Sequence, residues 1–225
     1  MFGNRKNRDE IMVKWEESIC FNCKINCCAG EPIHLLQSEW KSIAKDVIQP
    51  PKLFESKYHV LILDQCPFQF PNRACAIQEK KPYLCYGFPF MASLIEGGLE
   101  FSLTTECPNW ERFATLNHFY HAVISQFYLM GFTANALEEN PSEKMDIVSD
   151  FDKITSYVSQ ATKKKAFFRQ KLVCLMKNRT EMLVLAKMIY RTKVHPLHIP
   201  KGIITRLKNL YTNSIVSGSY LLRDE

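Results

Sequence analysis

The feature that most limits how this chain can fold is its uneven distribution of cysteine. Residues 20–28 read CFNCKINCC, so four cysteines lie within nine residues, and Cys27 and Cys28 are adjacent. Four further cysteines follow at Cys66, Cys75, Cys85 and Cys107. The ninth, Cys174, stands alone in an apolar segment, where core packing is the simpler interpretation. An odd number with an adjacent pair, which could bridge only through a strained ring, favours free thiols or metal ligands over disulfides.

The first residues, MFGNRKNRDE, are basic but have no apolar stretch behind them, which argues against a secretory signal. No stretch approaches the roughly 20 apolar residues of a membrane span. We therefore expect a cytoplasmic protein without a transmembrane segment, in a reducing compartment that keeps thiols free.

Charge divides the chain as well. Residues 1–110 carry 12 Lys/Arg and 13 Asp/Glu, residues 111–152 carry 2 and 7, and residues 153–223 carry 15 and 1. Cysteines and cations therefore gather in different parts of the chain. We interpret residues 1–110 as a cysteine-rich, metal-binding module and residues 111–225 as a helical, basic module.

Local patterns predict the elements of the first module. The segment 37–48 reads as a helix with Ser38 as its cap, and KYHVLIL at 57–63 reads as a strand. The segment FMASLIEGGLEFSLTT predicts a β-hairpin that turns at Gly97 and Gly98.

In the second module, apolar residues recur at helical spacing. These segments are 113–132, 151–160, 166–177, 181–192 and 200–211. The expected fold class is mainly α (α+β). A small, irregular, metal-nucleated N-terminal module with a β-hairpin would precede an all-α, basic C-terminal module.

Thiolates bind soft or borderline metals, and closely spaced cysteines let one loop supply several ligands. The candidate ligands are Cys20, Cys23, Cys27, Cys28, Cys66, Cys75, Cys85 and Cys107. Eight thiols exceed the four that one tetrahedral zinc or one [4Fe–4S] cluster requires. One site with spare thiols and two separate sites therefore both remain open.

The order of these cysteines resembles the CxxCxxCC family of zinc- or iron-chelating domains over about residues 18–110. After a Cys-Pro-Phe at Cys66, residues 75–89 read CAIQEKKPYLCYGFP, close to the family pattern C-x-I-x-x-x-R-P-x-x-C-x-x-F-P. Lys81 replaces the usual Arg, and Glu39 takes the acidic position where a helix starts. The resemblance implies a metal-binding domain.

The resemblance leaves the first ligand open. Three residues separate Cys23 from Cys27, where the family name implies two, so either Cys20 or Cys23 is the first ligand. The cluster is also similar to that of flagellin lysine-N-methylase, which is associated with iron–sulfur. This similarity and the adjacent Cys27–Cys28 pair favour a [4Fe–4S] cluster, with zinc as the alternative.

The segment TKKKAFFRQK at 162–171 combines cations with aromatic rings, which is typical of surfaces that contact phosphates and stack on bases. The candidate nucleic-acid-binding residues are Lys163, Lys164, Lys165, Arg169 and Lys171. An acidic protein complex is the alternative partner, and a solvated helix face is the ordinary explanation of such a charge run.

No dinucleotide-binding, phosphate-loop, serine-hydrolase or zinc-protease motif occurs in the sequence. We therefore favour an accessory binding protein over a cluster-dependent protein-modifying enzyme, such as one with lysine methyltransferase-like activity. A zinc-stabilised protein–protein interaction module is a third interpretation. His118 and His121 have a spacing that can chelate, but a polar helix face explains them more simply. His195 and His198 lie in a proline-rich loop with no evident partner.

Overall fold

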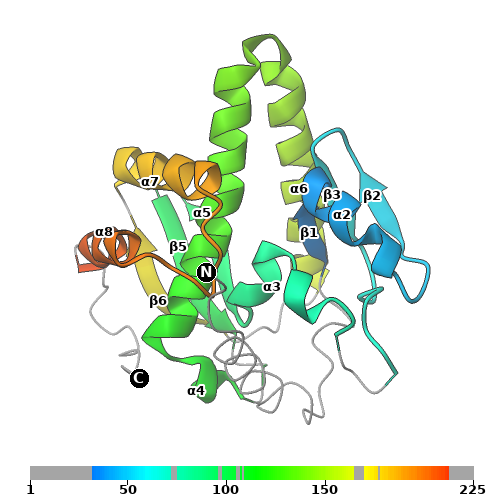
Figure 1. Ribbon diagram of the computed structural model, residues 1–225, viewed down its shortest axis with the longest axis horizontal. Coiled ribbons are helices and arrows are strands. Elements are labelled where there is room, and N and C mark those ends of the chain that lie inside the picture. Colours follow the sequence, from blue (N-terminus) through cyan, green and yellow to red (C-terminus); the bar gives the residue numbers. More distant parts are fainter. Residues whose placement is uncertain are drawn as a thin grey trace, which may run out of the picture.

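The computed structural model describes residues 32–71, 75–95, 98–104, 107, 109–164, 170–176 and 178–212 (Figure 1). In chain order its elements are β1 (Ile33–Leu36), α2 (Gln37–Ile43), η2 (Ala44–Asp46), β2 (Leu53–Glu55), β3 (His59–Ile62), η3 (Gln78–Lys80), α3 (Tyr83–Gly87), β4 (Phe90–Ile95), β5 (Gly98–Thr104), α4 (Trp110–Phe113), α5 (Leu116–Glu139), η4 (Pro141–Glu143), α6 (Lys144–Lys164), β6 (Gln170–Met176), α7 (Arg179–Arg191) and α8 (Lys201–Thr212). The predicted fold class, mainly α with some β, is confirmed.

The first sheet has the order β1-β3-β2, and both pairings are antiparallel. Its central strand β3 confirms the strand predicted at 57–63, and all four of its residues are buried. A small core forms beneath the sheet from Leu35, Ile43, Val60, Ile62, Cys66, Phe68 and Ile77. With seven residues, this core alone is too small to keep the N-terminal part of the chain folded, because burial contributes only about 25 cal/mol per Å² of apolar surface.

The helix predicted over 37–48 is present but shorter, because α2 ends at Ile43 and continues as the 3-10 turn η2. The proposed cap Ser38 is wrong. Leu36 occupies the cap position, and its N–H donates to the Oε2 of Glu39 at 2.8 Å. The glutamate at the third helical position thus accepts a hydrogen bond from the backbone N–H of the cap residue.

The second sheet has the order β4-β5-β6. The predicted hairpin is confirmed as β4 and β5, but Gly98, which was predicted in the turn, is the first residue of β5 and pairs with Ile95. The helix predicted over 166–177 is wrong, since β6 pairs antiparallel with β5 and lies in the segment expected to be all-α. A short apolar run fits a strand as well as a helix, and the free edge of β5 offers backbone partners that a helix would leave unused.

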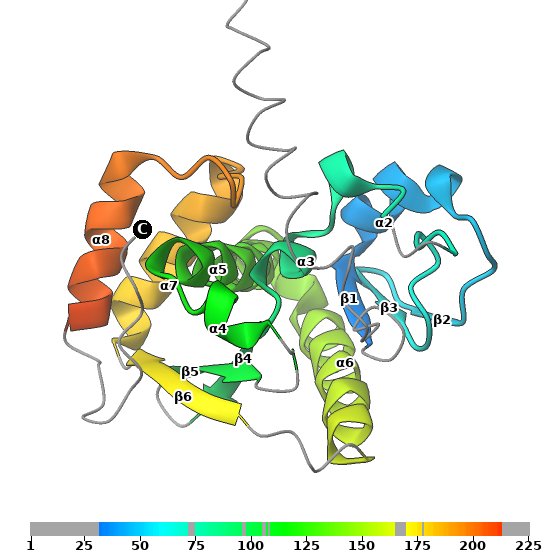
Figure 2. The same ribbon diagram turned by 90° about the horizontal axis from the view of Figure 1, so that it is seen from below.

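Helix α5 runs through the middle of the molecule, between the two sheets (Figure 1). Seen from below, α5, α7 and α8 cover one face of the β4-β5-β6 sheet (Figure 2). The larger core lies between these helices and the sheet, with Phe101, Phe119 and Phe127 almost fully buried. Four of the predicted C-terminal helices are therefore confirmed, as α5, α6, α7 and α8.

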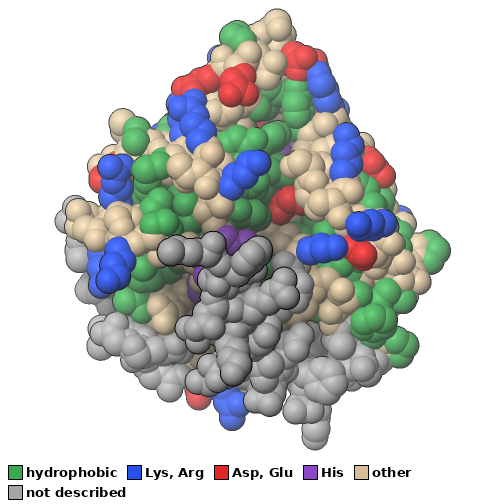
Figure 3. All heavy atoms as spheres, viewed as in Figure 1, with side chains coloured by type: hydrophobic (Ala, Val, Ile, Leu, Met, Phe, Trp, Pro, Cys, Tyr) green, Lys and Arg blue, Asp and Glu red, His purple; other side chains and the backbone are tan. Residues whose placement is uncertain are grey.

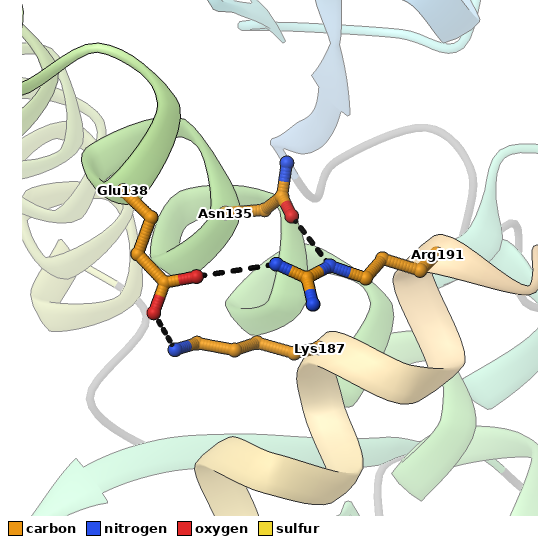
Figure 4. A network of polar contacts seen from close by, with 4 residues as sticks. All are labelled: Asn135, Glu138, Lys187 and Arg191. Carbon is orange, nitrogen blue, oxygen red and sulfur yellow. Dashed lines mark hydrogen bonds and ion pairs between the residues drawn. The ribbon is translucent and has the colours of Figure 1, made fainter.

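A polar network fixes α7 against α5 (Figure 4). The Arg191 Nε donates to the Asn135 Oδ1 at 2.8 Å, and its Nη2 donates to the Glu138 Oε2 at 3.2 Å. The Lys187 ammonium donates to the other oxygen of Glu138. Exposed ion pairs of this kind contribute about 1 kcal/mol or less each, so we assign them to alignment of the helices rather than to stability.

The β4-β5-β6 sheet and the larger core contain residues from both sides of position 110. The division into modules 1–110 and 111–225 stays a prediction. Among the residues described, no helix combines the length and apolar character needed to span a bilayer.

Two histidines form a buried pair inside the first sheet. The Nε2 of His34 and the Nδ1 of His59 are 3.0 Å apart and share a hydrogen bond. Burial lowers the pKa of His34 to about 3, helped by the charge of His59. Burial likewise lowers the pKa of His59 to about 4, against the opposing effect of the Asp150 carboxylate on α6. Both rings are therefore neutral at pH 7.

We predict that Gly131→Ala destabilises the protein. A Cβ at Gly131 would overlap the Ala186 carbonyl of α7 and lie 2.7 Å from the Tyr190 Cβ, so α5 and α7 would have to separate. Overpacking of this kind costs about 1–3 kcal/mol of unfolding free energy, measured by urea denaturation. The matched control is Gly202→Ala on α8, where a Cβ meets nothing within 4 Å. We expect that control to stabilise by about 0.4–1 kcal/mol, and equal effects of the two changes would contradict the packing.

We predict that acid weakens the fold through His34 and His59. Both pKa values lie below the unfolded value of 6.5, so their contribution is complete above that pH and is lost as the pH falls from 6.5 to about 4 for His59 and to about 3 for His34. Between those limits each histidine should lower the unfolding free energy by roughly 1.4 kcal/mol per pH unit. His34→Asn should make the slope between pH 5 and 6 shallower by about that amount. An unchanged slope would show that His34 titrates normally in the folded protein.

Candidate metal centre

The four described candidate ligands lie in three places. Cys66 and Cys75 flank a loop after the first sheet, Cys85 lies in α3, and Cys107 precedes α4. None of these four described cysteines is in a disulfide. Cys66 and Cys107 are buried, with 8% and 4% of their surface exposed, and Cys75 and Cys85 are half-buried.

The loop of Cys66 and Cys75 is folded against the small core. Gln69 and Cys75 form an isolated antiparallel bridge, and the Ala76 N–H donates to the Phe68 carbonyl at 2.8 Å. The Gln49 Nε2 donates to the Cys66 carbonyl at 3.2 Å. Cys66 belongs to the small core and Cys75 packs against it, so this core holds both thiols in place.

The pKa of Tyr86 responds to both Cys75 and Cys85. Its side chain is buried, and this burial is the main reason why its pKa rises to about 12. Negative charge on Cys85 and then on Cys75 raises the pKa further, so both sulfur atoms lie within electrostatic reach of the Tyr86 hydroxyl. The charges of two cysteines from separate segments therefore both act on Tyr86.

The carboxylate of the half-buried Glu39 holds the start of α3. Its Oε1 accepts from the Tyr83 N–H at 2.9 Å, and its Oε2 accepts from the Leu36 N–H. Burial raises the pKa of Glu39 even though these two backbone hydrogen bonds act to lower it. One side chain therefore joins the first sheet to the five-residue helix that carries Cys85.

A cluster of four histidines lies beside this helix. The ring centroids of His118 and His121 are 5.6 Å apart, and those of His195 and His198 are 5.8 Å apart. His195 also packs edge-on against Tyr86 at 5.0 Å. Figure 3 shows histidine side chains near the middle of this face, below a band of hydrophobic side chains.

These histidines are not the simple polar features that their spacing suggested. His118 is buried, and its Nε2 donates to the Phe88 carbonyl at 2.6 Å. Burial lowers the pKa of His121 to about 3, and the charges of His118 and His195 lower it further. The approach of His195 to α3 was missed, because no sequence pattern relates a loop at 192–200 to a helix at 83–87.

The described residues do not complete a metal site. Among them, no three His, Cys, Asp or Glu side chains are placed to hold one ion. Four of the candidate ligands, Cys20, Cys23, Cys27 and Cys28, lie outside the described residues. The full ligand set therefore stays a prediction.

The candidate nucleic-acid residues are also outside this description. Lys165 and Arg169 lie beyond the described backbone, and the side chains of Lys163, Lys164 and Lys171 are not described. The structure does show that the segment 162–171 spans the end of α6 and the start of β6. It is thus not one continuous helix.

We predict that Glu39→Gln loosens α3. The amide keeps one acceptor but turns a donor toward one of the two N–H groups, so a buried hydrogen bond is lost at a cost of roughly 1–3 kcal/mol in unfolding free energy. Amide hydrogen exchange at Tyr83 or Leu36 should become faster. The exposed Glu55→Gln is the matched control and should change neither quantity. Unaltered exchange at both amides in Glu39→Gln would refute this role.

Comparison with known proteins agrees with the cysteine arrangement. Residues 19–117 match the model of the CxxCxxCC family, described as a putative zinc- or iron-chelating domain. No curated protein and no solved structure matches the chain significantly. The matched range begins just before Cys20 and ends just after the start of α5, so it contains all eight candidate ligands together with Glu39. Over residues 19–117 the chain is therefore similar to the zinc- or iron-chelating domains of the CxxCxxCC family.

Proposed function

We propose that this protein is a metal-binding accessory protein whose cysteines hold a [4Fe–4S] cluster. The observation that carries this proposal is the match of residues 19–117, which contain all eight candidate thiols, to a zinc- or iron-chelating family. Four of the eight candidate thiols are described, and none of these four is in a disulfide; ligation of a soft metal requires the reduced thiolate. When bound, the cluster would supply either a structural cross-link or a site for one-electron transfer.

The local structure supports a folding role for the metal. The cysteines lie in loops and in a helix of five residues, which has too few backbone hydrogen bonds to be stable in isolation. Metal binding at such sites is coupled to folding and contributes on the order of 10 kcal/mol for structural zinc. Zinc is the alternative occupant, and acid-labile sulfide distinguishes the two because only a cluster contains it.

The second part of the proposal concerns the basic helices, which we assign to nucleic acid. Residues 178–212 contain seven Lys/Arg and one acid, Glu181. A surface of this composition attracts phosphate groups over several ångströms. The protein would then act as a metal-stabilised adaptor on nucleic acid or on a nucleoprotein complex.

We predict that Cys85→Ser and Cys28→Ser each lower the metal content of protein purified without oxygen, measured by elemental analysis. Residues 18–110 should also become sensitive to limited proteolysis, because the loops lose their cross-link. Cys174→Ser is the matched control, since Cys174 lies in β6 opposite Phe101 and outside the matched segment. Full metal content and protection in both Cys85→Ser and Cys28→Ser would refute the ligand assignment.

A further inference from the structure

We infer that the exposed face of α8 is a nucleic-acid-binding surface that contacts the phosphate backbone. This inference rests on the nucleic-acid part of the proposed function and gives it a location, outside the segment 162–171 that the sequence singles out. The surface is defined by the exposed residues Lys201, Gly202, Thr205, Arg206, Lys208 and Asn209.

The two faces of α8 are sharply divided. Ile203, Leu207 and Leu210 are buried in the larger core. At 100° per residue the six exposed residues fall within an arc of about 160°, and the three buried ones lie opposite them. Lys201 and Lys208 lie about 20° apart at one end of this arc, and Arg206 lies about 140° from Lys201 at its other end, so all three cations are outside the side of the helix that faces the core.

The cations of this surface are not neutralised within the described part of the chain. Lys201, Arg206 and Lys208 form no ion pair there, whereas Lys187 and Arg191 of α7 are both paired with Glu138. The one polar contact given for Arg206 is a weak one, from its Nη1 to the Met188 Sδ at 3.8 Å. No acidic residue occurs anywhere in α8. The helix therefore presents three charges that are available to an anion.

The residues between the cations favour nucleic acid over a lipid surface. Helices that lie on membranes insert large apolar side chains next to their cations. Here the residues on the exposed arc are glycine, threonine and asparagine, and the apolar side chains face the core. Lys and Arg donate hydrogen bonds to phosphate oxygens, whereas the Thr205 hydroxyl already donates to the Lys201 carbonyl at 3.0 Å. At Gly202 there is open space where a Cβ would stand, so the sugar-phosphate backbone of a nucleic acid can approach the helix backbone closely.

The test compares Lys201→Gln/Arg206→Gln/Lys208→Gln with wild type in the full chain. Fluorescence anisotropy would measure binding to a duplex and to a single-stranded oligonucleotide at salt concentrations from about 50 to 200 mM. Removal of one cation that touches a phosphate should reduce the slope of log K against log salt by about 0.9 on the duplex and 0.7 on the single strand. With two or three such cations removed, we expect the slope on the duplex to fall by about 2–3.

The matched control is Lys41→Gln/Lys45→Gln/Lys52→Gln, which removes the same charge from exposed positions of the first sheet and its helix. It should leave the slope close to that of wild type, and equal melting temperatures would show that all variants fold. If wild type binds neither oligonucleotide at about 50 mM salt, or binds only vesicles of anionic lipid, both this inference and the nucleic-acid part of the proposed function fail. If wild type binds but the α8 variant matches the control, only the inference fails.

Discussion

The arrangement of the candidate metal centre depends on one half-buried carboxylate. Glu39 accepts backbone hydrogen bonds from Leu36 and Tyr83, and so it joins the first sheet to α3 across more than 40 intervening residues. A buried charged group is tolerated only when such bonds replace its water, and its pKa is still raised by burial. The family pattern has an acidic residue at this position, and the structure gives that residue a physical role in placing Cys85.

The molecule separates its two candidate activities in space. Helix α5 lies between the β1-β3-β2 sheet on one side and α7 and α8 on the other (Figures 1 and 2). Gly131 permits the close contact of α5 with α7, and the Glu138 network aligns the two helices. The two regions meet where His195, between α7 and α8, packs edge-on against Tyr86 of α3. In this account the metal stabilises the first half of the molecule, and the second half supplies the charge.

Patterns with strong periodicity predicted the fold well. The hairpin at 90–104 and α5 are set by local chemistry, and both were predicted. The strand β6 was mistaken for a helix, since its apolar run fits either state and only the distant edge of β5 decides between them. The capping by Glu39 and the approach of His195 to Tyr86 depend on tertiary contacts that no local pattern encodes. The cysteine spacing, by contrast, identified the chelating domain because metal ligation restricts sequence directly.

The central claim is that the cysteines hold an iron–sulfur cluster. The most direct test is the iron, zinc and acid-labile sulfide content of the full chain purified without oxygen, together with its absorption spectrum. The account predicts coloured protein with about four iron and four sulfide per chain, and little zinc. Colourless protein that contains zinc would keep the chelating domain and overturn the cluster. Protein that is folded, protease-resistant and free of both metals would contradict the account as a whole.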